Sequence, residues 1–331
     1  MIISRTPLRI SLFGGGSDLP AFFEKKQGCV VSLSINQYIY ISINKLFDSR
    51  EILLKYSKFE RVHSPKELNH KIARELLDLE KINGVDISVN SDVPAGTGMG
   101  SSSSFSVGLL KAIDELRGYS WNKFELAEKA IEVELDRLKE PIGLQDHYAA
   151  AFGGINRFTF HKGRKVEVAP IILSEDELAI FESSMLLVRV GGTRSASQLL
   201  SEIQDNAEDN SNVEVFSELA QMAQNVTKDL LLDSKDLGAL LNQSWELKKS
   251  THSLISNSEI EDKMSFGKSA GASGAKLLGA GSSGFILFVG NPDKMNLLRN
   301  KFGSSTLIRP RLDVDGSRII YNSELGNQSG F

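Results

Sequence analysis

The segment PAGTGMGSSSS, residues 94–104, is the most informative part of this sequence. It follows a predicted strand over 82–90 and precedes a predicted helix whose apolar residues, from Phe105 to Leu116, share one face. Glycines at 96, 98 and 100 let the backbone adopt positive φ and approach a ligand closely. The free N–H groups and the dipole of the following helix then favour an anion. We therefore predict that this loop binds phosphate.

The four serines at 101–104 admit more than one interpretation. Their hydroxyls can cap the helix, donate to phosphate oxygens or enter the coordination shell of Mg²⁺. A glycine–serine turn with a serine N-cap is the plainer alternative, but four serines exceed what capping needs. The segment is not a Walker A sequence, because no Gly-Lys-Ser/Thr follows the glycines.

Composition limits the classes of function. The 38 Lys and Arg residues are balanced by 42 Asp and Glu and form no basic runs, which argues against a nucleic-acid partner. Cys29 is the only cysteine, so an internal disulfide and a cysteine-based metal cluster are excluded. Arg5 and Arg9 interrupt any signal-peptide-like run, and the late apolar run 285–289 is too short to span a membrane. We expect a cytoplasmic protein without a membrane partner.

The hydrophobic pattern predicts an α+β fold with two domains, 1–180 and 181–331. Near-alternation over 8–13 and 29–44 predicts half-buried strands, and the early strands follow one another without helices, unlike a regular βαβ array. Turn residues at Asp315–Gly316 predict a hairpin. Helices are expected over 65–81, over 122–139 with Asn122 as N-cap, and over 195–250 with a polar interruption at 202–212.

Two carboxylates stand out on chemical grounds. Glu134 lies on the helix that ends before Pro141. Glutamates are common on surface helices, so this residue alone would not indicate a functional site. Asp146, in GLQDHYAAAFGG, sits among small and aromatic residues that are expected to be buried. A buried carboxylate is costly unless it is paired or binds a cation. Phosphoryl transfer needs one carboxylate to hold Mg²⁺ and another to orient the attacking hydroxyl.

Two further segments are candidates for ligand contacts. RTPLRISLFGGGSD (5–18) places three glycines and the Asp18 carboxylate at a strand end, where the carboxylate can accept hydrogen bonds from sugar hydroxyls. The alternative is that Asp18 caps a helix over 19–26. RVGGTRSAS (189–197) places Arg194 beside a Gly-Gly turn, where it can grip a substrate phosphate or be an ordinary surface residue.

The segment GAGSSG (279–284) matches GxGxxG, which suggests a dinucleotide fold. That fingerprint requires a helix after the glycines, whereas here a strand over 285–289 is predicted. Close packing of this turn against the loop 94–104 fits better. The histidines show no metal-ligand spacing, so we interpret them as surface or packing residues and leave His147 open because it follows Asp146.

Together these motifs resemble the GHMP kinase superfamily of galactokinase, homoserine kinase, mevalonate kinase and phosphomevalonate kinase. PAGTGMGSSSS resembles its P-x-x-x-G-L-G-S-S signature, with Met99 for the usual Leu and Ser103 for a small Ala. RTPLRISLFGGGSD is similar to the first motif and GAKLLGAGSSG to the third. The resemblance implies an N-terminal domain like domain 2 of ribosomal protein S5 and a ferredoxin-like C-terminal domain, with ATP and a sugar between them.

The resemblance also implies roles for individual residues. It makes Asp146 the catalytic base or orienter, and it assigns Mg²⁺ to Ser102 and Glu134. ATP phosphates are assigned to Pro94, Gly96, Gly98, Gly100, Ser101, Ser102 and Ser103. The acceptor is assigned to Arg9, Gly15, Gly16, Ser17 and Asp18, to which we add Arg194.

The implied reaction is transfer of the ATP γ-phosphoryl group to a sugar hydroxyl. Within the superfamily, the runs RTPLRISLFGGGSDLPAFF, GLQDHYAAAFGG and KLLGAGSSGF most resemble the kinases of heptose phosphates. Gly15 and Gly16 replace an acidic residue and a histidine of galactokinases, which argues against galactose. The alternatives are a kinase for another sugar such as L-fucose, a non-catalytic regulator that binds ATP and sugar, and an oxidoreductase resting on GAGSSG alone.

Overall fold

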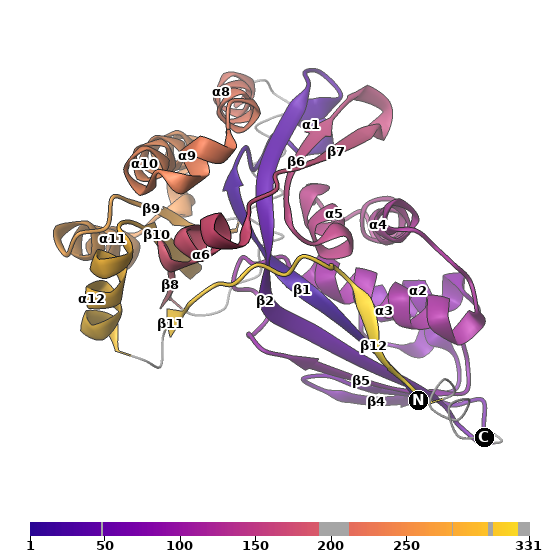
Figure 1. The fold of residues 1–331 in the computed structure, drawn as a ribbon. Coiled ribbons are helices and arrows are strands. Elements are labelled where there is room, and N and C mark those ends of the chain that lie inside the picture. Colours follow the sequence, from indigo (N-terminus) through magenta and orange to yellow (C-terminus); the bar gives the residue numbers. More distant parts are fainter. Residues whose placement is uncertain (48, 192–211, 280, 304–306, 324–331) are drawn as a thin grey trace.

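The computed structural model describes residues 1–47, 49–191, 212–279, 281–303 and 307–323. These residues form two sheets, each with helices packed against it (Figure 1). The larger sheet has the strand order β12-β1-β2-β5-β3-β4, with β6 added to β2 and β7 to β6. Its strands are β1 (Ile2–Phe13), β2 (Gly28–Lys45), β3 (Ile52–Lys55), β4 (Phe59–Val62), β5 (Val85–Ser91), β6 (Ile155–Phe160), β7 (Val166–Pro170) and β12 (Arg318–Asn322).

The long strands β1 and β2 form an antiparallel pair at the centre of the larger sheet. The first part of β2 pairs with β6 and the last part with β5. Burial alternates only at the start of β1 and at the end of β2. The expectation of half-buried strands is therefore wrong for residues 8–13, which are all buried, and is confirmed within 29–44 only over 39–44. Elsewhere both strands are buried on both faces, because helix α8 (Val213–Gln224) packs against β2 on the side opposite α5 (Gln145–Phe152).

Helix α3 (Ser101–Arg117) packs on β1 and β2, with α2 (Lys71–Leu79) and α4 (Lys123–Ile131) beside it (Figure 1). The helix expected over 65–81 is shorter, because a 3₁₀ turn at Pro65–Glu67 precedes α2 and the chain between them is not helical. The Glu60 carboxylate accepts the backbone N–H groups of Asn69 and His70, at 2.6 and 3.2 Å, and the His70 side chain caps α2. These bonds set the start of the helix.

The helix expected over 122–139 begins as predicted and ends differently. Asn122 and Glu125 form a reciprocal capping box at the start of α4. From Glu132 to Arg137 the chain continues as a π-helical segment, which ends before Pro141. Widened turns of this kind often occur at functional sites, and this one carries Glu134.

The smaller sheet is antiparallel with the order β11-β8-β10-β9. Its strands are β8 (Met185–Val190), β9 (Gly274–Leu277), β10 (Gly284–Val289) and β11 (Leu307–Ile308). Helices that follow β8 include α9 (Lys228–Leu232), α10 (Ser234–Ser250) and α11 (Ser258–Ser269), and α12 (Pro292–Phe302) joins β10 to β11. The chain thus runs from β8 through helices to β9 and β10, and then through α12 to β11. This order of elements is the ferredoxin-like arrangement, so that expectation is confirmed.

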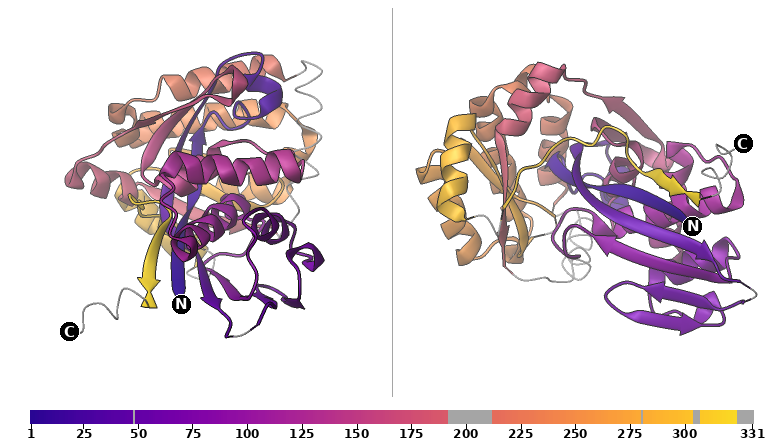
Figure 2. Two further views of the ribbon diagram at one scale, coloured as in Figure 1. Left: turned by 90° about the vertical axis from the view of Figure 1, so that its right-hand side faces the viewer. Right: turned by 60° about the horizontal axis from the view of Figure 1, so that its bottom comes forward.

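The hairpin expected at Asp315–Gly316 is wrong. After β11 the chain crosses from the smaller sheet to the larger one, where β12 pairs antiparallel with β1 (Figure 2). Gly316 does turn the chain, at φ +76°, but the turn docks against the backbone of Ala151 and Phe152. The boundary at residues 180 and 181 stays a prediction. Among the described residues, no helix combines the length and apolar character needed to cross a membrane.

Candidate active site

A cavity of about 1110 Å³ brings together segments that lie far apart in the sequence. Its wall includes Arg9 and Asp18 from the first segment, the loop 94–103, and the carboxylates of Glu134 and Asp146. The second half of the chain adds α8, α10, β9 and Gly279 to the wall. Gly15 and Gly16 also line this cavity.

The loop has the backbone that its glycines predicted. Gly96, Gly98 and Gly100 have φ of +76°, +76° and +75°. Gly100 is the N-cap of α3, and no side chain caps the helix there, so the interpretation of the serines as helix caps is wrong. Ser102 instead donates to Glu134, and Ser104 donates to the carbonyl of Pro7. The N-terminus of α3 is therefore left open toward the cavity.

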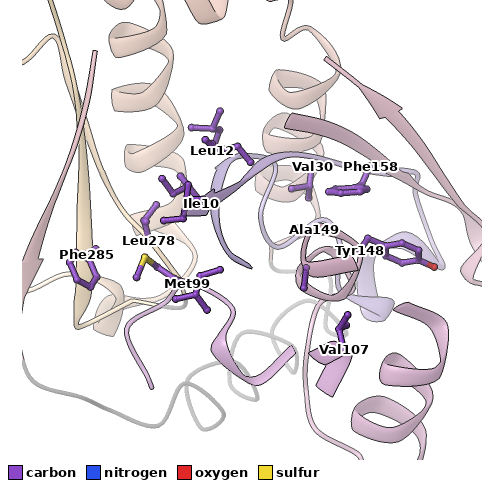
Figure 3. Packing of buried hydrophobic residues seen from close by; sticks show 14 of the residues in the cluster. Ile10, Leu12, Val30, Met99, Val107, Tyr148, Ala149, Phe158, Leu278 and Phe285 are labelled. Atoms are coloured by element: carbon purple, nitrogen blue, oxygen red, sulfur yellow. The ribbon is translucent and has the colours of Figure 1, made fainter. Parts of the chain in front are cut away.

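The second glycine-rich segment packs directly on this loop, as predicted. A Cβ atom on Gly279 would lie 2.3 Å from Cα of Gly98, and one on Gly284 would lie 2.5 Å from the Thr97 carbonyl oxygen. Buried Met99 lies beside Leu278 in the same contact (Figure 3). The segment enters strand β10 rather than a helix, which rules out the dinucleotide interpretation of GAGSSG.

Glu134 is 1% exposed and is held by three side chains. Ser102 Oγ donates to it at 2.7 Å and Ser106 Oγ at 2.5 Å, and His147 Nε2 lies 2.9 Å from Oε1. Burial alone would raise the pKa of Glu134, but His147 and the two hydroxyls outweigh it and lower the pKa. The carboxylate is therefore charged beside the loop.

Asp146 forms a two-pronged ion pair with Arg9. Arg9 Nε and Nη2 donate to its two carboxylate oxygens at 2.6 and 2.8 Å, and Arg9 Nη1 donates to the Gly98 carbonyl at 2.6 Å. Asp146 Oδ2 would lie 3.2 Å from a Cβ atom on Gly100. The guanidinium thus fixes the carboxylate against the loop.

Asp18 is 3% exposed and does not cap a helix, since the N-cap of α1 (Pro20–Phe23) is Leu19. Its carboxylate accepts the backbone N–H groups of Gly16 and Gln145, at 3.0 and 3.2 Å. Burial, followed by the negative charge of Asp146, raises its pKa. A Cβ atom on Gly143 would lie 2.0 Å from Asp18 Oδ2, so the carboxylate needs a glycine there.

Some expected site residues lie elsewhere. Ser17 is buried behind the cavity wall, where its hydroxyl donates to the carbonyls of Gly14 and Cys29, so we no longer assign it a substrate contact. Arg194 lies outside the described residues. Other side chains at the site escaped prediction. Ser106 lies one turn after Ser102 on the same helix face, a spacing that could have revealed it.

Glu134 with Ser102 offers hard oxygen donors, which suit Mg²⁺ when a nucleotide's phosphates complete its shell. Among the described residues no group of three or more His, Cys, Asp or Glu could hold a metal by itself. Such a set fits a metal that arrives with a phosphate ligand rather than one bound by the protein alone.

Comparisons with known proteins identify the family of the chain. Residues 67–154 match the GHMP kinases N terminal domain, and residues 222–306 match the GHMP kinases C terminal domain. The chain is 30% identical over 315 residues to D-glycero-alpha-D-manno-heptose 7-phosphate kinase of Campylobacter jejuni, covering 90% of this chain and 92% of the relative. It is 28% identical over 223 residues to a mevalonate kinase of Pyrococcus horikoshii, covering 66% of this chain and 63% of the relative.

A solved structure, described as a D-glycero-D-manno-heptose 1-phosphate kinase from Bacteroides thetaiotaomicron, superimposes with a TM-score of 0.79. It is 26% identical and covers 97% of this chain and 100% of that chain. The two domain matches and the extent of these similarities leave one conclusion. The chain belongs to the GHMP kinase family of ATP-dependent kinases and is a phosphotransferase with an alcohol group as acceptor.

Proposed function

We propose that the protein phosphorylates the anomeric hydroxyl of D-glycero-D-manno-heptose 7-phosphate with ATP. The product is the 1,7-bisphosphate, a precursor of GDP-heptose for surface polysaccharide, and we place the reaction in the cytoplasm. The main support for the proposal is that two carboxylates are connected to the same glycine loop. Glu134 accepts a hydrogen bond from Ser102 of the loop, and Asp146 is paired with Arg9, which also donates to the loop. The Campylobacter jejuni relative, which carries this substrate in its name, supports the choice of acceptor.

The side chains divide the work as follows. Loop amides from 96–103 bind the phosphates of ATP, and Glu134 with Ser102 holds Mg²⁺, which when bound neutralises phosphate charge. Asp18 orients the sugar through its hydroxyls. Asp146, fixed by Arg9, accepts the proton of the attacking hydroxyl as its oxygen bonds to the γ-phosphorus and the bond to ADP breaks. Positioning and charge neutralisation supply most of the rate.

A coupled ADP-release assay across acceptors tests the proposal, with Asp146→Asn as the inactive control. Heptose 7-phosphate should be turned over far better than unphosphorylated sugars, L-fucose included. Equal or better turnover of a free hexose would contradict the heptose assignment and leave the kinase intact. Silence of the wild type toward every acceptor, with ATP still bound, would favour a non-catalytic regulator.

A further inference from the structure

Two lysines from the second half of the chain line the cavity. Lys248 comes from α10 and Lys276 from β9. Lys276 is 3% exposed, and Lys248 is surrounded by protein atoms but keeps part of its surface open to the cavity. Both contribute to the same wall as Asp18. Lysine is rarely buried without an anionic partner, so the pair requires an explanation.

Among the described residues, neither ammonium group forms an ion pair with a carboxylate. Lys248 Nζ donates to the carbonyl of Gly279. Lys276 Nζ donates to the carbonyls of Ser11 and Leu12, at 3.2 and 2.7 Å. An ammonium group has three N–H donors, so Lys248 has donors to spare. The nearby guanidinium of Arg9 is already bound to Asp146 and to the loop.

Burial and neighbouring charges lower the pKa values of both lysines. Burial, followed by the positive charge of Arg9, lowers the pKa of Lys248 to about 8, although Asp18 and Asp146 oppose the shift. Burial, followed by Lys248 and Arg9, lowers the pKa of Lys276 well below its usual value. Like charges held together at this depth are unfavourable until an anion joins them.

We propose that Lys248 and Lys276 form a subsite for a phosphate group, with Lys248 in contact with the phosphate and Lys276 beside Lys248 in the cavity lining. The idea rests on the proposed function, because the loop 94–103 is taken to hold ATP. The phosphate has two possible sources in that reaction: a phosphate already carried by the acceptor, or the γ-phosphoryl group in transfer. Lys248 lines the same cavity as Asp18, to which the proposed function gives the sugar, so we favour the phosphate of the acceptor.

A purely structural role is the alternative, and it applies best to Lys276. Its two bonds tie β9 to the end of β1 and so join the two halves of the molecule. Lys248 is therefore the residue to substitute. Its neighbour Lys249 provides a matched control, because Lys249 pairs with Glu246 and Glu261, at 2.9 and 3.5 Å. Both substitutions remove one positive charge from the same helix turn.

The test measures binding rather than turnover. Inorganic phosphate is titrated into the enzyme saturated with Mg²⁺ and a non-hydrolysable ATP analogue, so that the loop is already filled, and the melting temperature is followed. Lys248→Met should weaken phosphate about 10- to 100-fold, the loss expected for a hydrogen bond to a charged group. Lys249→Met should bind phosphate as the wild type does. Should Lys248→Met not fold, Lys248→Gln replaces it.

A second arm compares the affinity of each variant for the ATP analogue and for ADP. If Lys248→Met weakens the analogue but neither ADP nor phosphate, the subsite serves the γ-phosphoryl group. Unchanged binding of both phosphate and the analogue would overturn the proposal. No arm requires a turned-over sugar, so a failure of heptose 7-phosphate as substrate is distinguishable from a failure of the subsite.

Discussion

Replacing Gly279 by alanine tests whether the second glycine-rich turn positions the phosphate loop. Alanine at this φ of +75° costs about 1–2 kcal/mol of unfolding free energy. Its Cβ would also lie 2.3 Å from Cα of Gly98, where ordinary contact begins at 3.4 Å, so the loop must retreat by about 1 Å. Overpacking of this kind adds about 1–3 kcal/mol. A displacement of about 1 Å in a reacting group can lower the rate about 100-fold.

Gly163→Ala is the matched control, because Gly163 has a φ of +74° and a methyl group added there would have nothing within 4 Å. Denaturant unfolding should show the cost of positive φ in both variants and the extra overpacking cost only in Gly279→Ala. Steady-state assays with varied ATP should show kcat/KM reduced about 100-fold in Gly279→Ala and unchanged in Gly163→Ala. Near-normal kcat/KM in Gly279→Ala would refute the reasoning.

Three other substitutions address the acids. Asp146→Asn should lower kcat about 100-fold or more while ATP affinity, measured by competition, stays close to normal; a near-normal kcat would remove Asp146 from the chemistry. Gly143→Ala should push the Asp18 carboxylate aside and raise KM for the acceptor more than KM for ATP, and equal changes in both would count against the role of Asp18. Because the pKa of Glu134 is lowered in the folded state, its charge stabilises the protein above the unfolded pKa of 4.5, and this contribution is lost as pH falls through the folded pKa. Urea unfolding from about pH 6 to about pH 3 should therefore show a shallower loss of stability in Glu134→Gln than in the wild type, and parallel curves would contradict this.

The sequence was informative where local chemistry is decisive. The glycines at 96, 98 and 100 predicted positive φ, and Asn122 with Glu125 predicted a capping box. The packing of GAGSSG on the loop was predictable because no helix follows it. The expectation for Asp146 rested on the cost of a buried carboxylate, yet its side chain is 21% exposed, and it is Glu134 that is buried. The roles of both acids rested on the family resemblance.

What could not be predicted depends on contacts distant in sequence. The start of α2 is set by Glu60, which lies in strand β4. Local periodicity does not contain this contact, so the predicted helix was too long. The crossing of the chain to β12 replaces a hairpin that was plausible from Asp315–Gly316 alone. Lys276 lies in an apolar strand, and its place in the cavity wall follows from the packing of the two halves.

The position of the metal in the nucleotide complex tests the central claim most directly. A crystal structure with Mn²⁺ in place of Mg²⁺ and a non-hydrolysable ATP analogue would locate the ion by its anomalous signal. Our account predicts the ion within about 2.5 Å of oxygens from Ser102 or Glu134, with the analogue's phosphates on the loop 96–103. An ion and phosphates bound more than about 10 Å from that loop would contradict it.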